Sequence, residues 1–251
     1  YFNKLIKIKP NNEDLKYAYS TFNLSIGNFT NAWEYFESRL KIKKQYKSFK
    51  KNEKIKNKTI KVEKLNTKNK ILVLREQGIG EEILFSSIYN DIIEKFDNVK
   101  IETDKRLVNI FKNSFEKNIF FPEGYFSNNP ANIDKFDYVI YAGSFLRLFR
   151  KNKKSFIKNY YLKPENEKIN YFKEQLSNFD KNLKIGISWK SVLNIYGNLK
   201  SLSINDFSYI FKKNRSIINL QYGNVEEEIN FLKNRGYKLI NFDDLNIYND
   251  F

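Results

Sequence analysis

The chain contains no histidine, no cysteine and no methionine among its 251 residues. Without imidazole or thiol side chains it cannot form a Ser-His-Asp or Cys-His nucleophile, a Cys/His zinc site or a disulfide framework. Any chemistry must come from carboxylates, lysines, arginines, tyrosines, hydroxyls and backbone amides. Because an initiator methionine is also missing, we expect the sequence to be a piece of a longer or processed protein.

Long apolar runs are missing too. No window approaches the roughly 18 apolar residues that cross a membrane, and the first ten residues lack the apolar centre of a signal peptide. We therefore expect a cytoplasmic protein without a membrane span. Apolar residues make up 41% of the chain, which is enough to build one large or two small globular domains.

Acidic residues are in the minority, 29 against 45 basic ones, and the net charge is +16. Residues 41–70 alone hold 13 lysines and two glutamates, a net of +11. This stretch has no arginine and few aromatic side chains that stack on bases. We interpret it as a solvated Lys-rich linker. A nucleic-acid contact strip, in which lysines neutralise phosphates, is the less favoured interpretation.

Residues 1–40 contain two segments with apolar side chains at helical spacing, separated by a break at Gly27. Leu15 and Tyr19 belong to the first segment, and Trp33 and Leu40 to the second. The pattern predicts a helical hairpin that resembles one tetratricopeptide repeat. An ordinary helical hairpin packed on the next domain is the alternative.

Short β-rich runs alternate with amphipathic segments from residue 71 onward, which is typical of parallel sheets. A charged helical stretch near 165–178 interrupts the series. We therefore expect two α/β domains, residues 71–160 and 161–251, the second incomplete after three strands. The predicted strands are 71–74, 99–102, 118–121, 138–142, 184–189, 217–221 and 238–242. The other predicted helices are 80–96, 105–113, 204–213 and 225–235.

A glycine-containing turn joins the first of these strands to a helix and is the first candidate site. Ligands of open α/β sheets bind at the carboxyl ends of strands, and the free N–H groups of a helix start favour an anion. Glu81 falls in the first helical turn, where an ionised carboxylate can act as general base toward an acceptor hydroxyl. The alternative is that Glu81 is simply a favourable first-turn residue. The acceptor-side loop consists of Gln77, Gly78 and Gly80.

A dinucleotide-binding fingerprint is another interpretation of the same turn. In it, Glu102 at the end of the next strand would bind a ribose. We do not favour this interpretation, because Ile83 stands where the third glycine belongs and three residues separate the strand from the first glycine.

Polar residues also follow the strands of the second series, and they form the second candidate site. A diphosphate needs lysines, hydroxyls and helix N-termini, and strand ends of a parallel sheet bring such groups together. A tyrosine there can stack on a base, and a glutamate can accept a hydrogen bond from a ribose. The predicted donor-binding residues are Ser188, Lys190, Lys200, Ser201, Gln221, Tyr222, Gly223 and Glu228.

The segment EQGIGEEILFSSIYNDI resembles the E-Q-G-x-G-D-x-x-x-F segment of bacterial tetratricopeptide-linked glycosyltransferases. These enzymes are similar to the ADP-heptose lipopolysaccharide heptosyltransferases of glycosyltransferase family nine. KIGISWKS, GNLKSLSINDF and INLQYGNVEEEI resemble the start of that family's nucleotide-sugar-binding domain, and WEYFESRL resembles the last repeat before its catalytic part. The resemblance covers most of the chain, in order.

The resemblance implies a GT-B fold, with the acceptor site on the first Rossmann-like domain, the nucleotide-sugar on the second, and no essential metal. No Asp-x-Asp occurs here to bridge a metal to a diphosphate. The family's Asp base falls on Glu81, one methylene longer, and its donor contacts fall on the residues of the second candidate site. The family's later donor segment, with its His and Gly-rich helix start, has no counterpart before Phe251, so the chain is expected to be catalytically incomplete.

The sequence thus predicts a metal-independent, inverting glycosyltransferase that moves a sugar from a nucleoside-diphosphate donor to a glycan or protein hydroxyl. Glu81 would be its base, and the helical hairpin would be a place for a protein partner. The alternative is a tetratricopeptide-type interaction scaffold whose transferase domain is inactive or truncated. A third, less favoured hypothesis is an anion or nucleic-acid binder that works through residues 41–70.

Overall fold

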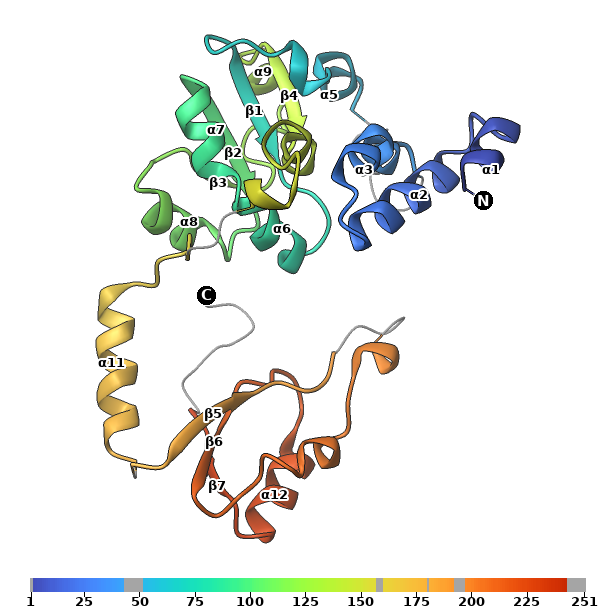
Figure 1. Cartoon of the computed structure of the whole chain (residues 1–251). Coiled ribbons are helices and arrows are strands. Elements are labelled where there is room, and N and C mark those ends of the chain that lie inside the picture. Colours follow the sequence, from blue (N-terminus) through green and yellow to red (C-terminus); the bar gives the residue numbers. More distant parts are fainter. Residues whose placement is uncertain (1, 43–51, 157–159, 180, 192–196, 243–251) are drawn as a thin grey trace. The chain divides into compact units, whose positions relative to one another are not determined.

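The computed structural model describes residues 2–42, 52–156, 160–179, 181–191 and 197–242. The chain forms two compact units, Tyr1–Pro164 and Glu165–Phe251, and each contains its own parallel sheet (Figure 1). The predicted mixed α/β class with parallel sheets is confirmed. Residues 43–51 of the predicted Lys-rich linker lie outside the described ranges. Across the described ranges, no helix has the length and apolar character needed to cross a bilayer.

The first unit begins with a helical hairpin. Helix α1 (Phe2–Ile8) leads into α2 (Glu13–Ser25), and α3 (Phe29–Tyr35) continues into the 3₁₀ helix η1 (Phe36–Lys41). Gly27 makes the turn between α2 and α3 with a φ of 76°, which suits glycine. Trp33 and Phe36 are buried in the same apolar cluster as residues of the sheet. The hairpin and the sheet therefore share one core.

Four parallel strands form the sheet of the first unit, in the order β3-β2-β1-β4. Along β1, Ile71 and Val73 point to one face, and Leu72 and Leu74 to the other. From β1 the chain adds β2 and β3 on one side of the sheet, and it then returns to add β4 on the other side of β1. The strand order therefore reverses between β1 and β4. Such a switch point is where open α/β sheets bind ligands. The strands are β1 (Lys70–Leu74), β2 (Asn98–Thr103), β3 (Phe120–Pro122) and β4 (Tyr138–Tyr141).

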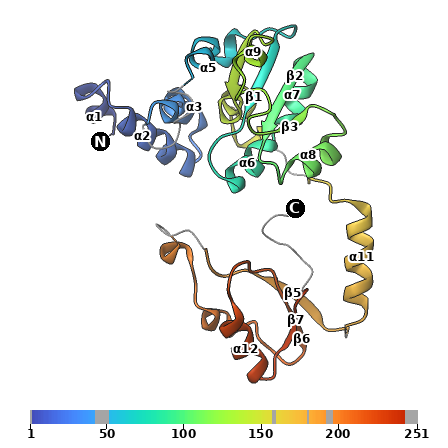
Figure 2. The same ribbon diagram turned by 180° about the vertical axis from the view of Figure 1, so that it is seen from behind.

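Helices cover both faces of this sheet, as the two opposite views show (Figure 2). One face packs on α6 (Ile79–Ser86), α7 (Tyr89–Lys95) and α8 (Val108–Phe115). The other face packs on α5 (Glu53–Lys58) and α9 (Pro130–Ile133). The remaining short helices are η2 (Val62–Lys64), η3 (Ala142–Phe145), α10 (Leu146–Phe149) and η4 (Lys153–Ser155).

The single helix predicted over residues 80–96 is wrong, because the chain forms α6 and α7 with a break between them. At the break, the N–H groups of Ser87 and Ile88 donate to carbonyls three residues earlier. The guanidinium of Arg150 donates to the Ser87 carbonyl at 2.6 Å and to the Asp91 carboxylate at 2.9 Å. The buried Arg150, from the far end of the unit, thus donates to the Ser87 carbonyl. In a continuous helix this carbonyl would accept a hydrogen bond from a backbone N–H.

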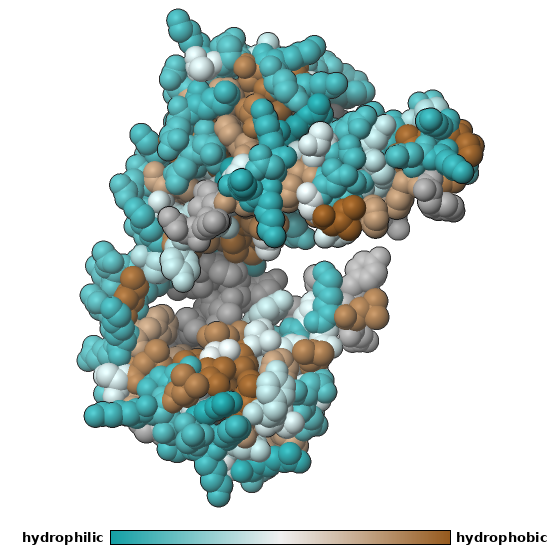
Figure 3. All heavy atoms as spheres, in the orientation of Figure 1, coloured by the Kyte–Doolittle hydropathy of each residue, from teal (hydrophilic) through white to brown (hydrophobic). Residues whose placement is uncertain are grey.

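The second unit contains a three-stranded parallel sheet in the order β5-β6-β7. Ile187, Ile217 and Leu232 are among its core residues. Figure 3 shows hydrophobic residues gathered over the β5 part of this unit. The elements are α11 (Asn166–Ser177), β5 (Leu183–Ile187), η5 (Asn198–Lys200), η6 (Ile204–Phe207), β6 (Arg215–Asn219), α12 (Glu226–Asn234) and β7 (Lys238–Ile240).

The helix predicted over residues 204–213 is also wrong, because only the 3₁₀ helix η6 forms there. Ser203 and Asp206 do make the capping box that their spacing predicts. Beyond it, the N–H groups of residues 208, 210 and 211 again donate to carbonyls three residues earlier. Ile204 and Phe211 both lie in the core of the unit.

A buried ion pair joins the hairpin to the sheet. The Arg39 guanidinium of η1 donates to both carboxylate oxygens of Glu76, at 2.7 and 2.9 Å, and neither side chain is exposed. The Gly143 N–H donates to the same carboxylate at 2.5 Å, and Ser144 Oγ accepts from Arg39 at 3.0 Å. A Cβ at Gly143 would lie 2.6 Å from a Glu76 oxygen, so only glycine leaves room for this contact.

Glu76→Gln is expected to lower the free energy of unfolding by about 3 kcal/mol, because it removes the buried counter-charge of the Arg39 guanidinium and leaves it only the partly exposed Glu37 carboxylate. Urea denaturation measures the change. Lys163→Gln is the matched control. It breaks an exposed ion pair with Glu116 and should leave the midpoint unchanged. Equal midpoints for the two variants would show that the buried pair is not a structural requirement.

Candidate functional site

The turn between β1 and α6 presents the first candidate site at the carboxyl end of a central strand. Gln77 has a φ of 63°, a left-handed conformation that costs a non-glycine residue roughly 1–2 kcal/mol. Gly78 is the N-cap of α6, and Gly80 lies in its first turn with open space where a Cβ would stand. Strained residues of this kind cluster at binding and catalytic sites.

Three carboxylates of this turn have different environments. Glu76 is buried against Arg39, and Glu82 is buried on the inner face of α6. Glu81 is exposed, and among the described residues it has no hydrogen-bond or ion-pair partner. One of its oxygens lies 3.0 Å from the point where Gly78 would carry a Cβ, so the side chain folds back over the helix N-terminus. Of the three, Glu81 is the carboxylate that a ligand can reach.

Glu82 fixes the neighbouring strand end. Its carboxylate accepts from Thr103 Oγ1 and from the Asp104 N–H at 2.9 Å, and it pairs with the Arg75 guanidinium at 2.7 Å. Burial raises the pKa of the Glu82 carboxyl, although these donors oppose the shift. Asp104 is bound by Arg106 at 2.8 Å, and this contact is the main reason why its pKa falls to about 2.

A pocket of about 320 Å³ lies between the hairpin and α6, and we call it the hairpin pocket. Two polar residues, Gln77 and Glu81, also line it. Its apolar walls include Leu24, Phe29, Trp33, Leu84, Phe85 and Phe156. The indole N–H of Trp33 donates to the Arg150 carbonyl at 2.6 Å, which fixes the ring in the wall. Figure 3 shows a group of hydrophobic residues at the lower end of the hairpin in that view. The predicted base thus borders an apolar pocket.

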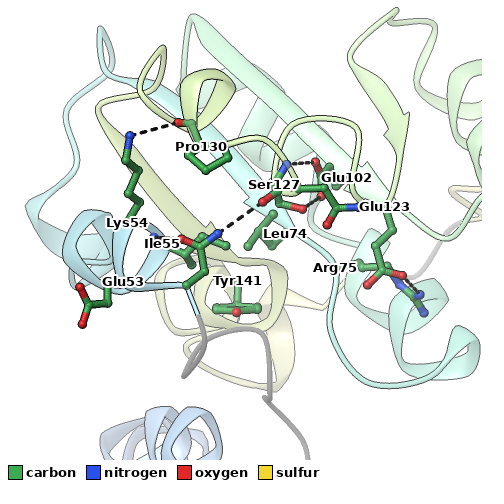
Figure 4. Close-up of a pocket in the computed structure, with 12 residues that line it drawn as sticks. Glu53, Lys54, Ile55, Leu74, Arg75, Glu102, Glu123, Ser127, Pro130 and Tyr141 are labelled. Atoms are coloured by element: carbon green, nitrogen blue, oxygen red, sulfur yellow. Dashed lines mark hydrogen bonds and ion pairs between the residues drawn. The ribbon is translucent and has the colours of Figure 1, made fainter.

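A second pocket, of about 690 Å³, opens at the ends of β1, β2 and β4 (Figure 4). Arg75, Glu102 and Glu123 lie along it, and Arg75 donates to Glu123 at 2.7 Å. The Glu102 carboxylate is buried and accepts from the N–H groups of Gly124, Phe126 and Ser127. These contacts shape the loop after β3, and they speak against Glu102 as a ribose ligand.

Gln221 holds together the strand ends of the second candidate site. Its side-chain oxygen accepts from Ser188 Oγ at 3.1 Å and from the N–H groups of Trp189 and Lys190 at 2.8 Å. Its amide nitrogen donates to the carbonyls of Lys190 and Tyr222 at 2.9 and 2.8 Å. Since Gln221 is buried and makes these five contacts, it supports the site and does not itself offer a free group to a ligand.

Lys190 and Glu228 form an ion pair above these strand ends. The Lys190 ammonium contacts the Glu228 carboxylate and also donates to the Asn224 carbonyl at 3.0 Å. Partial burial opposes ionisation of Glu228, but the Lys190 contact outweighs it, and the pKa of Glu228 lies below its ordinary value. The pair therefore presents one cation and one anion in close contact.

The other predicted donor-binding residues lie nearby in the chain. Ser201 Oγ accepts from the Ser191 N–H at 2.9 Å and donates to the Gly197 carbonyl at 2.6 Å. Lys200 is exposed at the end of η5. Gly223 takes a left-handed φ of 90° in the turn before α12. No group of His, Cys, Asp or Glu in the described ranges is arranged to hold a metal ion.

Sequence reasoning missed the residues that shape the first candidate site. Arg39 and Phe156 lie far from the turn in the chain. Arg39 falls within WEYFESRL, the segment that resembles the last repeat, but that resemblance does not indicate its contact with Glu76. The helical spacing of apolar residues such as Trp33 and Leu40 predicts a packing face for the hairpin but does not identify its partner.

The comparisons with known proteins give one relative. The chain is similar to Protein FlbA of Caulobacter vibrioides, with 29% identity over 184 residues. The match covers 65% of this chain and 30% of that protein, so the chain spans less than a third of the relative's length. No family model matches the chain, and no solved structure is similar to it.

Asp104→Asn is expected to lower the free energy of unfolding at pH 7 by about 2 kcal/mol, since the folded pKa of Asp104 is depressed from 3.8 to about 2. A depressed carboxyl pKa stabilises the fold above the unfolded pKa, and this contribution is lost as the pH falls from about 4 to 2. Urea denaturation of both proteins across this range measures the difference. A difference that stays constant with pH would contradict the assignment.

Proposed function

We propose that this chain carries the acceptor side and part of the donor side of a glycosyltransferase of the GT-B type. The enzyme would transfer a sugar from a nucleoside diphosphate to an acceptor hydroxyl, without a metal and with inversion. The observation that carries the proposal is the position of Glu81. It is the exposed carboxylate of a strained strand-to-helix turn, while the two other glutamates of that turn are buried and engaged.

Glu81 would act as the general base. Its carboxylate takes the proton of the acceptor hydroxyl while the acceptor oxygen bonds to the anomeric carbon. The bond from that carbon to the diphosphate oxygen breaks in the same step, and the electron pair leaves with the nucleoside diphosphate. A single displacement of this kind inverts the anomeric carbon.

The second candidate site would bind the diphosphate. Lys190 already sits in an electrostatic contact with Glu228, so the phosphates would compete with that carboxylate for the ammonium. Lys200 is exposed and adds a second positive charge. Together the two lysines would neutralise the charge that builds on the leaving diphosphate.

The resemblance of EQGIGEE and KIGISWKS to tetratricopeptide-linked transferases supports the same proposal. Each unit contains a parallel sheet, as the two Rossmann-like domains of a GT-B enzyme require. Helices α2 and α3 pack against each other, which agrees with a tetratricopeptide-type hairpin. The similarity to Protein FlbA gives no evidence for or against an activity, because the name of that protein states none.

An interaction scaffold is the second candidate function. Phe22 and Ile26 of the hairpin are exposed, and the Phe2 ring contacts the Phe22 ring at a tilted angle with centroids 5.6 Å apart. Exposed apolar side chains on a helical repeat are typical of a surface for another protein. A scaffold would not depend on Glu81.

Glu81→Gln in the full-length protein is expected to reduce sugar transfer roughly 100-fold or more, because the amide cannot accept the proton. Glu227→Gln is the matched control. It changes an exposed first-turn glutamate of α12 and should leave transfer unchanged. Transfer rates with radiolabelled nucleotide-sugars measure the effect. Equal rates for wild type and Glu81→Gln would remove Glu81 as the base.

Gly78→Ala tests the placement of the same carboxylate. The new methyl group would stand 3.0 Å from a Glu81 oxygen and displace it, so transfer is expected to fall about tenfold or more. Gly80→Ala changes the same loop but meets no atom within 4 Å, so it is expected to lower transfer much less than Gly78→Ala. Similar losses in both variants would mean that the turn itself, and not the Glu81 position, limits the rate.

Lys190→Ala and Lys200→Ala are expected to reduce the thermal stabilisation of the full-length protein by nucleoside diphosphates. A ligand at a hundred times its dissociation constant stabilises by about 2.7 kcal/mol. Lys213→Ala removes the same charge just before β6, at the opposite end of that strand, and should have no effect. Equal losses in all three variants would show general charge attraction without a specific site.

A further inference from the structure

The hairpin pocket has a charge pattern unlike that of the whole chain. The protein carries 45 lysines and arginines, yet among the described residues that line this pocket Glu81 holds the only formal charge. The pocket is therefore complementary to a neutral or cationic group and repels an anionic one. An acceptor whose hydroxyl lies beside a phosphate or carboxylate does not fit this environment.

The polar groups of the pocket are few and partly engaged. The Thr21 hydroxyl donates to the carbonyls of Tyr17 and Ala18 at 3.2 and 3.0 Å, within its own helix. Burial raises the pKa of the Tyr17 phenol, which therefore stays protonated. A glycan has a hydroxyl on nearly every carbon, and each buried hydroxyl without a partner costs free energy. The walls suit an apolar group better than a sugar.

Leu84 links this apolar surface to the proposed base. It lies three residues after Glu81 in α6, so both side chains occupy the same face of the helix, roughly 5–6 Å apart at Cβ. Leu84 is 62% exposed, which leaves it available for contact. An occupant of the pocket must thus place its apolar group about one helical turn from the hydroxyl that Glu81 would deprotonate.

We propose that the hairpin pocket binds an apolar side chain of a polypeptide acceptor, next to the serine or threonine whose hydroxyl reaches Glu81. This inference rests on the proposed transferase function and identifies its acceptor class. In an extended peptide, side chains two residues apart point to the same side at a spacing of about 7 Å. The pocket therefore selects acceptors with an apolar residue two positions from the modified serine or threonine.

Binding of short fluorescent peptides to the full-length protein tests the proposal without requiring sugar transfer. The probes are Ala-Ser-Ala-Phe-Ala and Ala-Ser-Ala-Glu-Ala, each labelled at one end, with octyl glucoside and maltose as unlabelled competitors. The phenylalanine peptide is expected to bind roughly tenfold to a hundredfold more tightly than the glutamate peptide, because the ring is buried and the carboxylate is repelled. Stronger competition by octyl glucoside or maltose than by the unlabelled phenylalanine peptide would overturn the proposal.

Leu84→Ser is expected to weaken binding of the phenylalanine peptide about threefold to tenfold, because the substitution removes part of the apolar wall of the pocket. Leu183→Ser is the matched control. It changes a leucine of the same 62% exposure at the start of β5 and should leave peptide binding unchanged. If Leu84→Ser has no effect, or both peptides bind equally, the pocket does not select apolar side chains.

The result separates this inference from the proposed function. Loss of peptide selectivity with intact nucleoside-diphosphate stabilisation would overturn the acceptor assignment and leave the transferase proposal standing. Selective peptide binding that depends on Leu84, with no response to any nucleotide and no sugar transfer by the wild-type protein, would support a peptide pocket and overturn the transferase proposal.

Discussion

Arg39 and Glu76 meet in the core of the first unit, 37 residues apart in the chain and without exposure to solvent. Two charges removed from water are stable only when their partners are fixed, so this contact fixes the end of the hairpin relative to the strand-to-helix turn. Gly143 and Ser144 bring the end of β4 to the same point. The walls of the hairpin pocket depend on this junction, because they come from the hairpin on one side and α6 on the other.

The same junction explains why the three glutamates of the turn lie in different environments. Glu76 and Glu82 face inward, toward Arg39 and toward Arg75 and Thr103, and both serve the fold. Helix geometry then leaves Glu81 on the outer side, next to Glu82 in sequence but about 100° around the helix axis. Glu81 is therefore the accessible carboxylate of the turn, and an accessible carboxylate is what the proposed general base requires.

The positions of the strands could be predicted from the sequence, because runs such as ILVL and YVIY are apolar, β-branched or aromatic and bounded by polar residues. All seven predicted strands occur in the described ranges. The helix over 80–96 was wrong because its break depends on Arg150, a tertiary contact from 63 residues away. The hairpin pocket could not be predicted for the same reason, since its walls come from segments that meet only in the folded chain. The clustering of Ser188, Lys190 and Gln221 followed from the rule that parallel strands end at one edge.

The two candidate sites differ in charge, as the proposed sugar transfer to a neutral hydroxyl would require. A base works best where no cation competes for its charge, and the lining of the hairpin pocket contains no lysine or arginine among the described residues. A leaving diphosphate needs cations, and the second site offers Lys190 and Lys200. Lys190 is paired with Glu228, so the cation is held in place, and the proposed diphosphate would replace that carboxylate. An overall charge of +16 would give no such separation by itself. The separation of charge between the two sites results from the local placement of a few side chains at strand ends and helix starts.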